Sequence, residues 1–413
     1  MRDAPRWIVA VAALGVLLMA AAGFALEDAA SSSRATVHAT EVPALLRLAF
    51  EHAWAGRSTQ AIQLFDAVTR ALEGQRDSTS TALAARAWSG RGDVLRWSDR
   101  DAESLAAYER AAALAPQDAT IGGVRNELRA RAATQVTTSI LQFDDSSKLV
   151  LWSTSVALDA GPACARAWLA DVEWQEMQGA AATTAGMRAR VGGRRLVAPG
   201  WTLATRIGGT RFATSNAELD LETTLARRGG GLPSLDLTYA FGERGTALHS
   251  LAARQSGLTG HELRLSGYKG FGSDRGVWFQ VHGGRLSDSN QYAALDASWE
   301  FRPLPRTVAQ VVLAASDFAH PSETYYAPRH EWALGGAFET MLLHTRRSEA
   351  RLQVNCGRAG NSGTQGIALA LRASATRRMW HRVAAIAHFE YEQSIQRTTY
   401  IARQARVELQ WRP

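Results

Sequence analysis

Residues 292–302 read Tyr292-Ala-Ala-Leu-Asp-Ala-Ser-Trp-Glu-Phe-Arg302, and from Leu295 onward apolar and polar side chains alternate. A period of two places successive side chains on opposite faces of a β-strand. The same alternation returns near the terminus, in Gln404-Ala-Arg-Val-Glu-Leu-Gln-Trp411. From about residue 134 to residue 413 we count about sixteen or seventeen such segments, separated by clusters of Gly, Asp, Ser, Asn and Pro.

Two architectures produce this pattern: a soluble β-sandwich or propeller, and an antiparallel transmembrane β-barrel. The segments are long enough to cross a bilayer at a tilt, and the chain ends on a strand that could close a barrel. Trp recurs at segment ends, and the chain holds 13 Trp against 8 Tyr and 12 Phe. Because membrane barrels place Trp in interfacial girdles, we predict a barrel over residues 134–413. About sixteen strands are expected, with fourteen or eighteen as alternatives, since bacterial barrels usually have an even number.

In such a barrel the polar face of each strand lines the lumen. Aromatic side chains on this face, among them Tyr292, could stack on sugar rings. The surplus of basic over acidic residues around the barrel would suit an anionic polymer. The alternative is that these charges simply pair and hydrate, as in the lumen of any porin. The charged pore-lining candidates are Asp171, Glu173, Arg188, Arg190, Glu218, Asp220, Glu222, Asp296, Glu300, Arg302, Glu349, Arg351, Arg406 and Glu408.

Residues 42–131 show a helical, Ala-rich pattern with an internal repeat. Trp88, Gly92, Tyr108, Ala111 and Pro116 have the spacing of a tetratricopeptide repeat. Gly92 would let two helices approach closely, and Pro116 would end the second helix. A first, looser copy precedes this one. We therefore expect an α-helical domain of two tetratricopeptide repeats, the alternative being an unrelated bundle of helical hairpins.

The N-terminus has the features of a secretory signal. Two Arg residues precede an apolar run that begins at Trp7 and closes on small residues up to Ala25. This predicts a signal peptide over 1–25 and a linker over 26–41, the alternative being an uncleaved anchor helix. The mean hydropathy of −0.17 is too low for a bundle of membrane helices.

Enzyme motifs are missing from the sequence. It has no Gly-x-Ser-x-Gly, no His-Glu-x-x-His and no Walker loop. Two Cys residues, Cys164 and Cys356, cannot form a four-ligand zinc site, although a disulfide between them is possible. The net charge of +7 does not indicate nucleic-acid binding in an exported chain. We expect no enzyme activity, no cofactor and no metal, with a catalytic triad assembled from distant strands as the alternative.

The order of signal peptide, repeats and C-terminal barrel resembles the outer-membrane exopolysaccharide secretins of synthase-dependent systems. These include the poly-N-acetylglucosamine export porin and the cellulose synthase C-subunit. The segment from Gly92 to Pro116 looks like the last repeat before the barrel in this group. The chain is also similar to the smaller YaiO-type outer-membrane proteins. The large exporters carry many repeats, whereas two are visible here.

This resemblance implies a passive outer-membrane conduit for a polysaccharide, with repeats in the periplasm that dock a protein partner. The expected contacts are outer-membrane lipid, the polysaccharide and that periplasmic protein. The alternative function is a non-conducting outer-membrane receptor or assembly scaffold.

Overall fold

The computed structural model describes residues 41–412 except 56, 99, 162–165, 199, 214–216, 229–232, 245–247, 272–273, 305, 346, 362, 381 and 396–398. The predicted signal peptide, the linker up to residue 40, and Cys164 lie outside the described residues. Cys356 has a free, exposed thiol. The helices are α2 (Val42–Trp54), α3 (Ser58–Ala71), α4 (Ser78–Trp97), α5 (Asp101–Leu114), α6 (Ala119–Ala132) and α7 (Leu251–Gln255). No helix among the described residues is long and apolar enough to cross a membrane.

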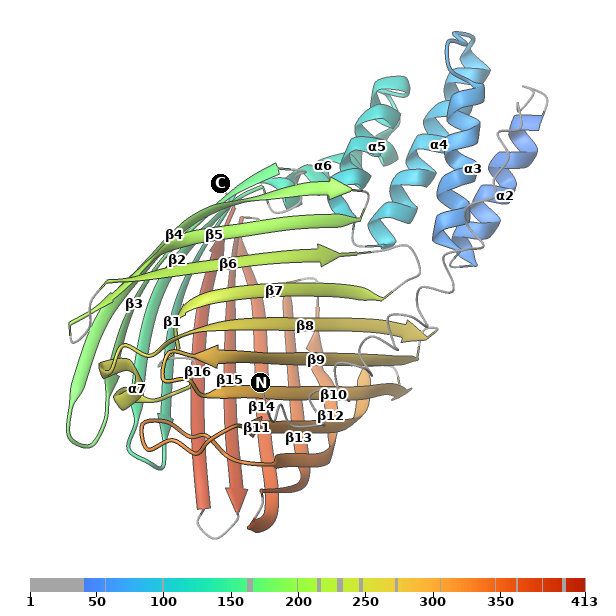
Figure 1. Cartoon of the computed structure of the whole chain (residues 1–413). Coiled ribbons are helices and arrows are strands. Elements are labelled where there is room, and N and C mark those ends of the chain that lie inside the picture. The colour runs from blue at the N-terminus through green and yellow to red at the C-terminus, as the bar shows by residue number, and fades with distance from the viewer. Residues whose placement is uncertain are drawn as a thin grey trace.

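Sixteen antiparallel strands close into a barrel in which each strand pairs with its sequence neighbours (Figure 1). The first and last strands complete the ring, with Val136 opposite Trp411 and Asp145 opposite Ala402. The predicted barrel and its strand number are confirmed. The strands are β1 (Gln135–Asp145), β2 (Val150–Ala160), β3 (Arg166–Gln178), β4 (Thr183–Ala198), β5 (Trp201–Phe212), β6 (Glu218–Arg227), β7 (Ser234–Glu243), β8 (Thr259–Phe271), β9 (Arg275–Leu286), β10 (Gln291–Leu304), β11 (Thr307–Phe318), β12 (Glu331–His344), β13 (Ser348–Asn361), β14 (Thr364–Trp380), β15 (Val383–Ile395) and β16 (Thr399–Trp411).

The outer wall of the barrel is apolar. Along β3, Trp168, Val172 and Trp174 are exposed, with Trp168 77% accessible. Further exposed side chains such as Ile207 on β5 and Leu263 on β8 continue this surface around the ring. So large an exposed apolar belt is unfavourable in water and matches the lipid-facing band of a membrane barrel.

The helical region joins the barrel at one end. Gly92 on α4 lies against Tyr108 on α5, where a Cβ on the glycine would be 2.6 Å from the tyrosine ring. Ser104, fully buried, donates to the Gly92 carbonyl at 2.8 Å, and Tyr108 donates to Asp93 at 2.7 Å. Burial and this carboxylate raise the pKa of Tyr108. Gly92 and Tyr108 therefore do hold α4 and α5 together, whereas the tetratricopeptide nature of the repeats stays a prediction.

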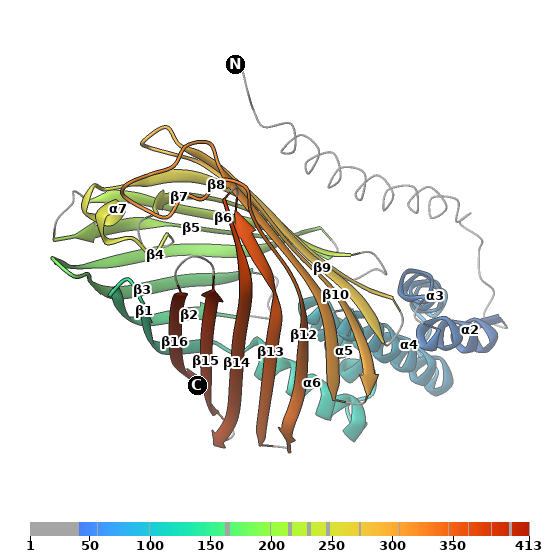
Figure 2. The same cartoon turned by 90° about the horizontal axis from the view of Figure 1, so that it is seen from below.

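The barrel has two unlike ends. Figures 1 and 2 show α2–α6 at one end, called the helix end below, and α7 at the other, called the loop end. At the helix end, Glu103 on α5 accepts from the backbone N–H of Gly200 at 3.1 Å and pairs with Arg100 at 2.6 Å. Gly200 has a φ of +74°, so this turn needs a residue that tolerates the left-handed region. The turn between β4 and β5 thereby fixes α5 to the rim.

Candidate functional site

The inward face of the barrel is identified by contacts that skip a strand. Arg190 on β4 reaches past β5 to Asp220 at 3.4 Å and Glu222 at 3.5 Å, both on β6. Only side chains on the concave side can meet in this way. Gly208 on β5 stands opposite Arg190, and a Cβ at Gly208 would lie 2.7 Å from the Arg190 Cα, so the two backbones approach closely there.

The structure places all fourteen pore-lining candidates on this inward face. Residues that are paired across neighbouring strands point to the same side of the sheet, so the strand registers show which residues share the face of Arg190. Contact of these residues with a solute stays a prediction. One group of them forms a charge ladder on β3–β6, in which Arg190 also pairs with Asp171 at 3.0 Å and Arg188 pairs with Glu173.

The other candidates lie away from this ladder. Arg351 pairs with Glu349 at 2.6 Å on β13, and Arg406 pairs with Glu408 at 2.8 Å on β16. On β10, Glu300 accepts from Gln310 at 3.1 Å. The predicted set is thus distributed over the whole wall and does not converge on one centre.

The basic surplus of the barrel sequence does not lie in the lumen, so it gives no support to an anionic polymer. Inward strand positions hold more carboxylates than guanidiniums among the described residues, and Arg195, Arg227, Arg275 and Arg377 instead occupy outward positions near the helix end. The inward carboxylates are Asp145, Asp159, Asp171, Glu173, Glu218, Asp220, Glu222, Asp236, Glu262, Asp296, Glu300, Glu331, Glu339, Glu349, Glu390, Glu392 and Glu408. The inward guanidiniums are Arg188, Arg190, Arg194, Arg206, Arg264, Arg302, Arg351, Arg372, Arg378 and Arg406.

Sequence reasoning missed the short helix α7, which follows β7 and crosses the lumen at the loop end. Leu251 packs with a cluster that includes Leu151 on β2 and Met177 on β3. Ala253, two residues later, belongs to a cluster with Leu286 on β9. Since β2 and β9 stand on opposite sides of a sixteen-strand ring, α7 bridges the two walls.

One buried cation fixes α7. Arg254 is fully buried, and its guanidinium lies 3.9 Å from the centroid of the Phe212 ring on β5. It also donates to Gln175 on β3 and lies 3.8 Å from Glu243. The break in alternation between β7 and β8, in Leu251-Ala-Ala-Arg-Gln255, was the available sequence signal.

A second loop, 319–330 between β11 and β12, also folds into this mouth. Tyr325 donates to Asp288 at 2.7 Å, and Asn290 donates to the Tyr325 hydroxyl at 2.9 Å. Burial and the Asp288 hydrogen bond raise the pKa of Tyr325 to about 12, so the hydroxyl keeps its proton. Ser250, the N-cap of α7, donates to the Thr324 carbonyl and joins the two loops.

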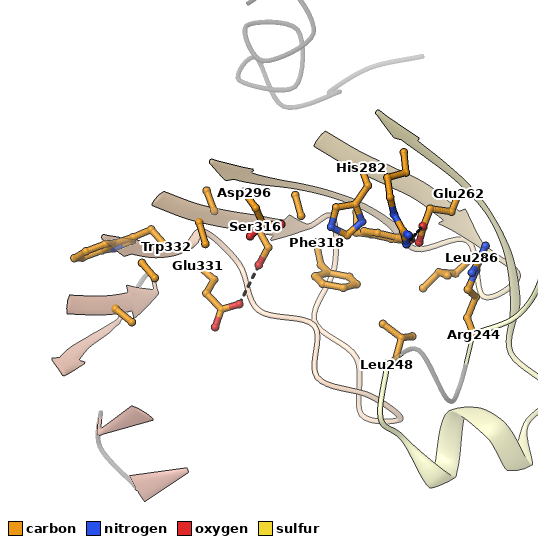
Figure 3. A pocket seen from close by; sticks show the side chains of 17 residues that line it. Arg244, Leu248, Glu262, His282, Leu286, Asp296, Ser316, Phe318, Glu331 and Trp332 are labelled. Carbon is orange, nitrogen blue, oxygen red and sulfur yellow. Dashed lines mark hydrogen bonds and ion pairs between the residues drawn. The ribbon is translucent and has the colours of Figure 1, made fainter. Parts of the chain in front are cut away.

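Beneath these loops lies a cavity of about 410 Å³ in the inner wall of β8–β12 (Figure 3). Asp296, Ser316 and Glu331 stand on one side of it, and His282 and Glu262 on the other. Tyr292 stacks on Phe318 with 5.4 Å between ring centroids and donates to Glu262 at 2.5 Å. Phe318 therefore covers one face of the Tyr292 ring, and stacking of Tyr292 on a sugar ring stays a prediction.

Comparison with known proteins bears on the fold. No family model and no curated protein matches the chain. A solved structure described as a bacterial polysaccharide outer membrane secretin has 12% identity and a TM-score of 0.57, and the match covers 68% of this chain and 99% of that one. The CymD monoaromatic hydrocarbon channel has 7% identity and a TM-score of 0.38 over 68% and 89% of the two chains. Pseudomonas aeruginosa OprD has 9% identity and a TM-score of 0.38 over 68% and 94%. The first likeness shows that this chain has the fold of an outer-membrane barrel.

Proposed function

We propose that the chain is an outer-membrane channel that exports an exopolysaccharide, with its helical domain in the periplasm. The observation that carries the proposal is a closed sixteen-strand barrel whose charged lumen meets a helical domain at one end. Sixteen strands leave space for an aqueous path. The two longest connections between strands, 244–258 and 319–330, both lie at the loop end, and long loops are typical of the extracellular side of such barrels.

Partner docking through the helices rests on a groove of about 510 Å³ lined by α3, α4 and α5. Trp88 lies there with the guanidiniums of Arg91 and Arg110 at 5.6 Å and 5.2 Å from its ring. Helix pairs of this kind present such faces to other proteins. We assign this groove to a periplasmic protein, and we assign no enzymatic step to the chain.

The test of export is polymer secretion by a strain that lacks this chain. Loss of extracellular polysaccharide, restored by the wild-type chain, is the expected result. Unchanged secretion would contradict the proposal. Retained secretion with a Trp88→Ala, Arg110→Ala chain would contradict the role of the groove alone.

The second candidate, a non-conducting receptor or scaffold, is favoured by one observation: α7 bridges opposite walls of the lumen. Conductance in planar lipid bilayers separates the two. An export channel should conduct once Leu251–Gln255 is replaced by a short Gly-Ser link. A scaffold that is plugged by further contacts would not conduct, either as the wild type or with the Gly-Ser link.

A further inference from the structure

Unpaired buried polar atoms occur elsewhere in the lumen, for example Nε of Arg188 and Nε of Arg206, but beneath α7 several of them line one cavity. On β3–β6, Arg190 alone has three carboxylates within 3.5 Å. In the cavity, the Asp296 carboxylate makes no hydrogen bond or ion pair with any described residue. The buried Nδ1 of His282, one strand away on β9, also has no hydrogen-bond partner within the described chain.

The cavity is also lined by nitrogen atoms that lack a hydrogen-bond acceptor. Among the buried nitrogens that lack a partner in the described part of the chain are Nε of Arg264 and both Nε and Nη2 of Arg244. Buried polar atoms are normally paired, because an unmet donor or acceptor costs free energy. A pocket in which several such atoms converge is therefore suited to a ligand that completes them.

The mixture of donors and acceptors indicates the ligand class. A simple cation would be repelled by Arg244 and Arg264, and a simple anion would be repelled by Asp296 and Glu331. A hydroxyl group both donates and accepts, so a polyhydroxylated ring satisfies both kinds of partner. The walls between the polar groups are apolar, from Phe318 and from small alanines on β10–β12, and suit the C–H face of a sugar ring.

The size and the position of the cavity agree with a bound sugar ring. The cavity volume of about 410 Å³ lies within the range of small-molecule sites, roughly 300–1,000 Å³. It opens on the inward face of β8–β12, along the path of the polymer in the proposed channel. Leu248, three residues before α7, lines it, so a bound ring would touch the loop that crosses the lumen.

We infer that this cavity is a binding site for one neutral sugar unit, with Asp296 accepting hydrogen bonds from its hydroxyl groups and His282 completing the hydrogen bonds. The inference rests on the proposed function and adds a subsite to it. The site holds a unit of the polymer at the loop end, next to α7, before it leaves the barrel.

The test is calorimetric titration of the full chain in detergent micelles. The probes are two neutral tetrasaccharides, cellotetraose and tetra-N-acetylchitotetraose, and the anionic tetragalacturonate. We expect a neutral probe to bind, and Asp296→Ala or His282→Ala to weaken its binding about tenfold or more, the loss typical of a hydrogen bond to a charged group. Glu323→Gln, an exposed change in charge on the neighbouring loop, is the matched control and should bind as the wild type does.

Three outcomes overturn the inference: no neutral probe binds, tetragalacturonate alone binds, or binding survives both cavity substitutions in a correctly folded barrel. Heat-modifiable migration in gels reports that folding. If the chain is required for polymer secretion while no neutral probe binds, the proposed sugar site is contradicted and the proposed export function is retained. If secretion does not need the chain, the export function falls as well.

Discussion

The guanidinium of Arg254 lies 3.9 Å from the centre of the Phe212 ring, and this contact holds α7 against the inner wall of β5. A desolvated cation–π contact contributes about 2 kcal/mol. Because Arg254 also donates to Gln175 on β3, one side chain ties α7 to two strands. Arg254 therefore adds a polar anchor to the apolar contacts that Leu251 and Ala253 make.

Replacing Arg254 with Ala should release α7. The loss of the Phe212 and Gln175 contacts should lower the ratio of closed to open channels at least about tenfold, since about 1.4 kcal/mol corresponds to a factor of ten. Single-channel recording in planar bilayers measures that ratio. Arg275→Ala, which removes an exposed charge at the helix end, is the control and should leave gating unchanged. Equal open fractions in wild type and Arg254→Ala would refute the role of Arg254 in holding α7.

Acidification should loosen the same loop through His249. Burial against Phe143, with 4.4 Å between the rings, lowers the pKa of His249 from its ordinary value of 6.5, and Asp145 opposes this only in part. The docked loop therefore favours the neutral imidazole. The resulting stability is complete above about pH 6.5 and declines as the pH falls below that value, because protonation is easier in the undocked loop.

Channel conductance recorded between about pH 7.5 and about pH 5.5 tests the predicted direction of this pH dependence. The open fraction should rise toward the acidic end. His249→Asn removes the titrating group and tolerates the left-handed φ of +48° at this position, so its pH response should flatten. A wild-type response that persists in His249→Asn would assign the effect to another group.

Replacing Arg190 with Gln should make the lumen more selective for cations. Arg190 neutralises Asp171, Asp220 and Glu222, and its loss leaves their negative charge facing the lumen. The fold should lose less than the about 3–5 kcal/mol typical of a broken buried pair, because the lumen is accessible to water. Reversal potentials in a salt gradient report the selectivity. Arg211→Gln on the outward face is the control, and an equal shift in both variants would contradict the prediction.

The helix pair provides a matched test of packing. Gly92→Ala would place a methyl group 2.6 Å from the Tyr108 ring and should destabilise the helical domain by about 1–3 kcal/mol. Gly122→Ala on α6 meets open space and should stabilise its helix by about 0.5–1 kcal/mol. Thermal unfolding of the full chain, followed at 222 nm, measures both. Equal effects of the two changes would contradict the account of Gly92.

Alternation along the chain was sufficient to predict the barrel and the face on which residues such as Asp171 and Asp296 lie. It was sufficient because a strand has only two faces and the register of a closed barrel fixes them together. The contacts of Arg190 could not be predicted, since they pass over β5 and join strands that are not neighbours in the sequence. Likewise, α7 depends on Met177 and Phe212, which are far away in sequence, and no local pattern records such contacts.

The central claim is that a polysaccharide passes through this lumen, and site-specific photocrosslinking in living cells tests it most directly. A photoreactive amino acid at Ser298 points inward on β10, and one at Ala297 points to lipid from the same strand. During export, the account predicts a polysaccharide adduct at position 298 and none at position 297. Absence of an adduct at position 298 in cells that are secreting the polymer would contradict it.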